Sequence, residues 1–123
     1  MTLQNTLYRT VSMQDAENGQ YLANIFLVRE NQIFKAHFTD LPVLPGACLV
    51  QISKEFIEEK LQQNVQITLF KNLKFLKTIN PDEFPEIMLC FSYKKSDENY
   101  AASITFSKDE HLFCKLDYLF ITS

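Results

Sequence analysis

The segment 37–51, which reads HFTDLPVLPGACLVQ, holds the residue types of this chain that are best suited to chemistry. His37 is one of only two histidines, and Gly46 is one of only two glycines. An imidazole with an ordinary pKa of about 6.5 is largely neutral at pH 7, so it can accept a proton and later release it. Gly46 follows Pro45 at the start of an apolar run, and the free N–H groups of a helix N-terminus stabilise negative charge. The segment therefore combines a candidate base with a candidate anion-stabilising backbone.

The element that must position these groups is a helix that begins at the second proline of the segment. The residues before Pro42 and Pro45 are extended, because a proline ring excludes the helical region for its predecessor. A helix can therefore begin only at Pro45. Proline lacks a backbone N–H, but this costs nothing in the first turn, where an N–H would have no intrahelical acceptor. Apolar residues at helical spacing predict that the helix continues from Gly46 to about Gln62 and packs on a sheet. These residues are Leu49, Val50, Ile52, Phe56, Ile57 and Leu61.

The opposite arc of the predicted helix is polar, and Gln51 lies in the middle of it. Because Gln51 points away from the apolar face, we do not expect it to meet His37 inside one subunit. Ser53 and Lys60 interrupt the apolar side, and no feature of the sequence explains them. The remaining polar residues of the arc are Lys54, Glu55, Glu58, Glu59 and Gln62.

Six strand-like runs flank this helix, two before it and four after it. The first two cover 7–13 and 21–29 and are joined by Asn18-Gly19, which accepts the positive φ angles of a tight turn. The later four, which predict a meander, cover 65–78, 86–93, 100–106 and 112–121. One helix can cover six strands only if the sheet curls around it. We therefore expect an α+β hot-dog fold, a curled antiparallel sheet of about six strands around one long central helix, as a single domain over residues 1–123.

Composition narrows the class of protein. The chain has 123 residues, 46% of them hydrophobic, and a net charge of −3, which predicts a globular protein and excludes a general attraction to nucleic acid or anionic lipid. Cys48, Cys90 and Cys114 are odd in number and far apart, so they form neither a disulfide framework nor a metal site and favour a reducing compartment. No window approaches the roughly 20 apolar residues of a membrane span, and the first residues lack a signal-peptide pattern. We expect a cytoplasmic protein.

Two segments resemble a known family. Residues 36–47, AHFTDLPVLPGA, resemble the signature of hot-dog 3-hydroxyacyl-(acyl carrier protein) dehydratases, in which His-Phe precedes a polar turn, a proline, two apolar residues and Pro-Gly at the helix start. Residues 74–82, KFLKTINPD, are similar to the strand that follows the helix in that family. The resemblance covers roughly residues 20–121. It implies removal of water from a 3-hydroxyacyl thioester to give a trans-2-enoyl thioester, without a cofactor, in fatty acid or polyketide-type biosynthesis.

The resemblance also implies roles for individual residues. His37 corresponds to the base that removes a proton from C2 of the thioester, and the backbone amides of Gly46 and Ala47 are the candidate donors to the enolate oxygen. The candidates for the acyl pocket are Phe38, Leu41, Pro45 and Phe75. The candidates for docking an acyl carrier protein, or the phosphate of its pantetheine arm, are Lys71, Lys74 and Lys77, although solvated strand positions explain them equally well.

Gln51 is the point at which this chain departs from the family, whose members usually carry Glu or Asp there. An amide cannot supply an acidic proton, but it can donate a hydrogen bond to the departing hydroxyl or hold a water, and His37 alone can shuttle the proton. A non-catalytic subunit that binds acyl chains or supports an active partner is therefore the alternative. A hot-dog thioesterase is a third reading, against which the motif argues.

The family resemblance further implies an oligomer. In that family the histidine and the acid that faces it come from different subunits of a dimer, and the outward direction of Gln51 agrees with this arrangement. We expect a homodimer, or a heterodimer with a paralogous dehydratase whose Glu or Asp faces His37, with a higher oligomer left open.

Overall fold

The computed structural model describes residues 2–36 and 42–123. Its elements in chain order are β1 (Tyr8–Asp15), the short 3-10 helix η1 (Glu17–Gly19), β2 (Tyr21–Leu27), α1 (Ile33–Ala36), α2 (Gly46–Leu61), β3 (Val65–Phe75), β4 (Glu86–Ser96), β5 (Asn99–Lys108) and β6 (His111–Thr122). The six predicted strands are confirmed to within about three residues at each end. Asn18 and Gly19 adopt positive φ angles of 63° and 73°, as the predicted turn requires.

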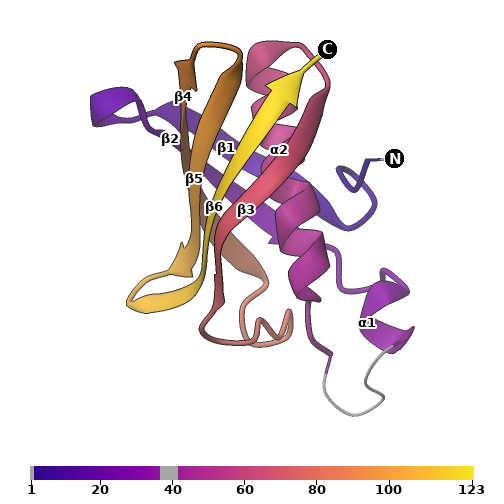
Figure 1. The fold of residues 1–123 in the computed structure, drawn as a ribbon. Helices are drawn as coiled ribbons and strands as arrows, with labels where there is room; N and C mark the ends of the chain where they lie inside the picture. The colour runs from indigo at the N-terminus through magenta and orange to yellow at the C-terminus, as the bar shows by residue number, and fades with distance from the viewer. Residues whose placement is uncertain (1, 37–41) are drawn as a thin grey trace.

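The strands form one antiparallel sheet that curls around α2, which confirms the predicted hot-dog arrangement. Figure 1 shows β1 and β2 crossing behind α2, with β3 running alongside it. The inner face of the sheet is apolar, and its largest fully buried side chains include Phe91, Phe106, Tyr118 and Phe120. In the described part of the chain, no helix has the length and apolar character needed to cross a membrane.

The position of β3 differs from the predicted meander. The strand order is β1-β2-β4-β5-β6-β3, so β4, β5 and β6 do meander but β3 lies beyond them at the far edge. The reason is that α2 carries the chain across the sheet before β3 begins. Among the strands that the structure describes, β3 pairs with β6 alone, from Val65 opposite Thr122 to Phe75 opposite Cys114, with two irregularities in its register.

The predicted helix is confirmed, with a small change at its start. Pro45 is the N-cap, with φ −63° and ψ 145°, so it precedes the first helical residue and does not occupy it. The helix ends at Leu61, where Gln62 turns left-handed with φ 54° and donates its N–H to Glu58 O. The predicted apolar face is buried at Leu49, Ile52, Phe56 and Ile57.

The structure explains both polar residues that interrupt the apolar face of α2. Ser53 is fully buried, and its hydroxyl lies 2.8 Å from the hydroxyl of Tyr118 on β6 while it donates to Val50 O. Lys60 places its Nζ 4.5 Å from the ring centroid of Tyr21. Ser53 therefore links the helix to the sheet, and the Lys60 ammonium is held over an aromatic face.

We predict that Tyr118 makes stability fall at alkaline pH. Burial raises the pKa of Tyr118 to about 12, with a further increase from the charge of Glu58 and a decrease from the Ser53 hydrogen bond. An unfolded tyrosine titrates near its ordinary value of about 10, so this contribution is complete below pH ~10 and is lost as the pH rises toward 12. Urea unfolding at pH 9 and pH 11 measures the decrease, which should be smaller in Tyr118→Phe. Ser53→Ala is the control, because it keeps the phenol and should keep the full decrease.

Candidate functional site

A pocket of about 440 Å³ lies where the N-terminus of α2 meets the segment that follows β3. Pro45, Gly46 and Leu49 form one wall, and Phe75 and Ile79 belong to the other. The Leu44 N–H donates to Ile79 O at 2.9 Å and ties the two walls together. Because the walls are largely apolar and a helix terminus opens into them, the pocket can hold an apolar chain that carries a polar group at one end.

Gly46 lies directly beneath the aromatic ring of Phe75. A Cβ atom built on Gly46 would lie only 2.9 Å from Cε1 and Cζ of that ring. The ring itself is half exposed, at 51% of the residue surface, so it covers the helix terminus without being locked into the core. Glycine at this position therefore lets an aromatic wall approach the backbone closely.

The N-terminus of α2 is one polar feature of this pocket. The first N–H groups of a helix have no intrahelical acceptor, and the N-cap Pro45 supplies no side-chain bond to them. Gly46 borders the pocket, whereas Ala47 is exposed and does not line it. Of the two predicted backbone donors, only Gly46 is thus placed at the pocket wall.

The structure brings some of the predicted site residues together and separates others. Pro45, Gly46, Phe75 and Lys77 all line the pocket, although they come from segments about 30 residues apart in sequence. Three further predicted residues, His37, Phe38 and Leu41, lie outside the described residues.

The three predicted docking lysines do not form one cluster. Lys77 lines the pocket, and its Nζ lies 2.8 Å from Nδ1 of His111. Lys74 is exposed and lies opposite exposed Lys115 in the β3–β6 register, which concentrates positive charge there. Lys71 borders a separate hollow with Asn72 and Asp117. Lys77 is therefore the predicted lysine placed to meet a ligand entering the pocket.

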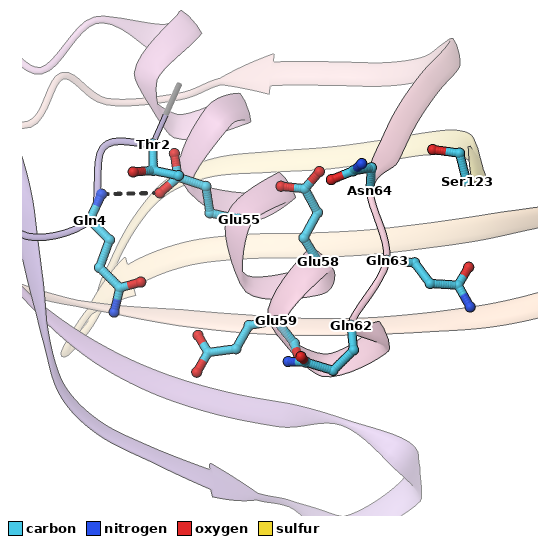
Figure 2. Close-up of a pocket in the computed structure, with 9 residues that line it drawn as sticks. All are labelled: Thr2, Gln4, Glu55, Glu58, Glu59, Gln62, Gln63, Asn64 and Ser123. Atoms are coloured by element: carbon cyan, nitrogen blue, oxygen red, sulfur yellow. Dashed lines mark hydrogen bonds between the residues drawn. The ribbon is translucent and has the colours of Figure 1, made fainter.

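The polar arc of α2, on which Gln51 lies, is covered in part by another segment of the chain. The neighbour of Gln51 one turn along α2, Glu55, belongs to the predicted polar arc but is only 8% exposed. Glu55 is buried because residues 3–8 fold over this arc of the helix. Figure 2 shows one of these contacts, between Gln4 and Glu55. Gln51 is itself half-buried, and its Nε2 donates to Oε2 of Glu55 at 2.9 Å.

Glu55 accepts hydrogen bonds from four donors, two on each oxygen. Oε2 accepts from the Leu3 N–H at 2.7 Å as well as from Gln51, and Oε1 accepts from the Gln4 N–H at 3.1 Å and the Tyr8 hydroxyl at 3.0 Å. Burial and the charge of Glu55 raise the pKa of Tyr8 well above its usual value, so the phenol stays protonated as a donor. Sequence reasoning missed this cluster. The only signal for it was the spacing of four residues between Gln51 and Glu55 on a helix.

The cysteines do not provide a nucleophile for this site. All three are free, and burial raises the pKa of Cys48 and Cys90, and that of Cys114 to about 12. A thiol with a raised pKa is largely protonated at neutral pH and therefore a weak nucleophile.

Comparisons with known proteins agree with this geometry. Residues 12–115 match the ApeI-like family, described as ApeI dehydratase. The dehydratase heterocomplex ApeI:P from Xenorhabdus doucetiae has a similar fold, with a TM-score of 0.77, 12% identity, and coverage of 92% of this chain and 96% of that chain. A hypothetical thioesterase with coenzyme A from Streptococcus pneumoniae TIGR4 is also similar, with a TM-score of 0.66, 11% identity, and coverage of 94% and 85%. No curated protein sequence matches the chain.

The contact between Gly46 and Phe75 predicts a strong coupling between substitutions at these positions. Alanine is favoured over glycine within a helix by up to about 1 kcal/mol. In the wild-type background Gly46→Ala should gain little or lose stability, because its Cβ displaces the Phe75 ring. In a Phe75→Ala background the same change should be stabilising. Chemical unfolding of the four proteins of this cycle measures the difference, and equal effects in both backgrounds would contradict the contact.

Proposed function

Because this chain belongs to the ApeI-like dehydratase family, we propose that it removes water from 3-hydroxyacyl thioesters to give trans-2-enoyl thioesters. The observation that carries the proposal is the pocket at the N-terminus of α2. Its apolar walls suit an acyl chain, and the amide of Gly46 suits a thioester oxygen that gains negative charge. We assign the acyl group to the pantetheine arm of an acyl carrier protein, in accordance with the resemblance of the 36–47 segment to carrier-protein dehydratases.

The proposed reaction begins with removal of a proton from C2 of the substrate by His37, which the family resemblance assigns as the base. The electrons of the C2–H bond move toward the thioester carbonyl, whose oxygen becomes negative and accepts a hydrogen bond from the Gly46 amide. The bond from C3 to the hydroxyl then breaks, a double bond forms between C2 and C3, and the proton taken by His37 leaves with the hydroxyl as water.

Gln51 has a supporting role in this proposal. A side-chain amide has no acidic proton, so it orients the departing hydroxyl or a water by hydrogen bonding while His37 both takes and returns the proton. The rate therefore depends on how well the amide is positioned.

We further propose a dimer formed through β3. This strand is the edge of the sheet beside β6, and an exposed edge with apolar side chains is prone to pair with another chain. β3 and the segment after it expose large apolar side chains at Leu69, Phe70, Leu73, Phe75 and Leu76. Because Phe75 is also a wall of the pocket, a partner along β3 would lie beside the site.

A second candidate function rests on Gln51. A subunit without the usual acid can bind the acyl chain, or complete the site of a paralogous dehydratase that supplies the acid, and have no turnover of its own. The similar structure from Xenorhabdus doucetiae is described as a dehydratase heterocomplex, which favours a partner of this kind.

We propose a reducing compartment such as the cytoplasm for this protein, because its own three cysteines, Cys48, Cys90 and Cys114, are free.

For the carrier protein, we propose that Lys77 is the docking residue with the greatest effect. It lines the pocket, and its Nζ lies over the ring of Phe84 at 5.3 Å as well as beside His111. This position suits an acidic carrier surface or the phosphate of the pantetheine arm.

The central experiment follows dehydration of a short 3-hydroxyacyl thioester by the purified protein. We expect turnover by the wild type and a loss of at least about 100-fold in His37→Ala, because general-base catalysis contributes roughly that much. Activity that survives His37→Ala would refute the mechanism. If the wild type is inactive and Gln51→Glu gains activity, the homodimer is not the enzyme, and the partner-subunit function is the correct one.

The dimer predicts a specific response to charge on β3. Leu73 is 42% exposed on that strand, and Leu73→Asp should weaken self-association by at least about 10-fold, because a buried interface residue is replaced by an uncompensated charge. Val11→Asp introduces the same charge at an exposed position of β1, the opposite edge, and should leave association unchanged. Sedimentation at micromolar concentration measures both. A monomeric wild type would exclude a homodimeric site.

A further inference from the structure

The pocket at the N-terminus of α2 has a closed apolar base and an open rim. The base is formed by Leu44, Leu49 and Ile79, which line the pocket and are at most 3% exposed. The rim is formed by residues 75–78, which line the same pocket and are all exposed. Because apolar carbons gain most from burial, an acyl chain extends into the base. The group attached to the sulfur of the thioester then lies at the rim.

Thr78 brings a hydroxyl to this rim. It lies between the buried Ile79 and the exposed Lys77, and it lines the pocket. Among the residues that the structure describes, none forms a hydrogen bond with the Thr78 hydroxyl. A hydroxyl both donates and accepts hydrogen bonds, so it can exchange a solvent water for a ligand group of either kind.

The hydrogen bond between the two walls of the pocket places Thr78 near the proposed position of the thioester. The Leu44 N–H donates to Ile79 O at 2.9 Å. Thr78 directly precedes Ile79, and Gly46 follows Leu44 by two residues, so both lie next to this bond on facing walls. When a thioester oxygen binds the Gly46 amide and the acyl chain fills the base, Thr78 is the hydroxyl beside the chain attached to sulfur.

We propose that Thr78 is a substrate-binding residue that recognises the amide group of the pantetheine arm. In that arm a short alkyl spacer joins the thioester sulfur to a secondary amide, which has one N–H donor and one C=O acceptor. The Thr78 hydroxyl can bond to either. This inference rests on the proposed function, in which the acyl group is carried on a pantetheine arm. It specifies how the protein distinguishes that carrier from a simple thiol.

Binding of two unreactive thioesters tests the proposal. Butyryl-pantetheine contains the amide, whereas S-ethyl butanethioate has the same acyl group without it, and neither has a 3-hydroxyl to lose. Thr78→Val removes the hydroxyl but keeps the branched shape of the side chain. We expect the Kd of butyryl-pantetheine to rise by about 3- to 10-fold, the range expected for one neutral hydrogen bond. The Kd of the ethyl thioester should not change. Isothermal titration calorimetry measures both.

Thr122→Val is the matched control. Thr122 pairs with Val65 at the start of β3, whereas the pocket residue Phe75 lies at the other end of that strand. Both Kd values should therefore be those of the wild type. Thr78→Ser retains the hydroxyl and should keep most of the affinity for butyryl-pantetheine. Equal losses for both thioesters in Thr78→Val would overturn the proposal, and so would an unchanged Kd for butyryl-pantetheine or no binding of it by the wild type.

Turnover separates this inference from the proposed function. In an active protein, Thr78→Val should raise the KM for 3-hydroxybutyryl-pantetheine by the same factor with little change in kcat, because the amide contact is the same in the ground state and the transition state. A fall in kcat larger than the rise in KM would contradict the role. If the wild type binds butyryl-pantetheine through Thr78 but has no turnover, the dehydratase function fails and recognition of the arm stands. If turnover occurs and Thr78→Val changes neither Kd nor KM, this inference fails and the dehydratase function stands.

Discussion

The packing of α2 inside the curled sheet is the constraint on which the rest of the structure depends. Its apolar face is buried by strands that must curve to reach it, and the chain crosses the sheet along α2 before β3 pairs at the far edge beside β6. The same arrangement brings the segment after β3 back to the start of α2. The pocket is therefore a consequence of how one helix is covered by one sheet.

The opposite side of α2 is covered by a different kind of interaction. Residues 3–8 close over it, and the contact is polar, since it is centred on the carboxylate of Glu55. Burial of a charged group is tolerated because donors occupy both of its oxygens. One of these donors is Gln51, so the N-terminal segment and a proposed site residue share the same hydrogen-bond cluster.

β3 connects the proposed site to the proposed assembly. Phe75, at its end, packs over Gly46 and forms a wall of the pocket. The strand has β6 as its neighbour in the sheet and exposes apolar side chains along its length. A subunit that covers this edge would reduce the exposed apolar surface and complete the surroundings of the pocket in one step.

The sequence by itself determined the helix from Gly46, the six strands and the hot-dog class, because these follow from local rules: proline geometry, the 3.6-residue period and alternation. It also placed Gly46 and Phe75 in the candidate site through their motifs. It did not determine the burial of Glu55, because the helical period reports only which residues share an arc and not which distant segment covers that arc. The tertiary structure alone decided that β3 lies beside β6, that Lys77 is separated from Lys71, and that the Gln51 amide donates to Glu55. Each of these depends on contacts between residues far apart in the chain, which no local pattern encodes.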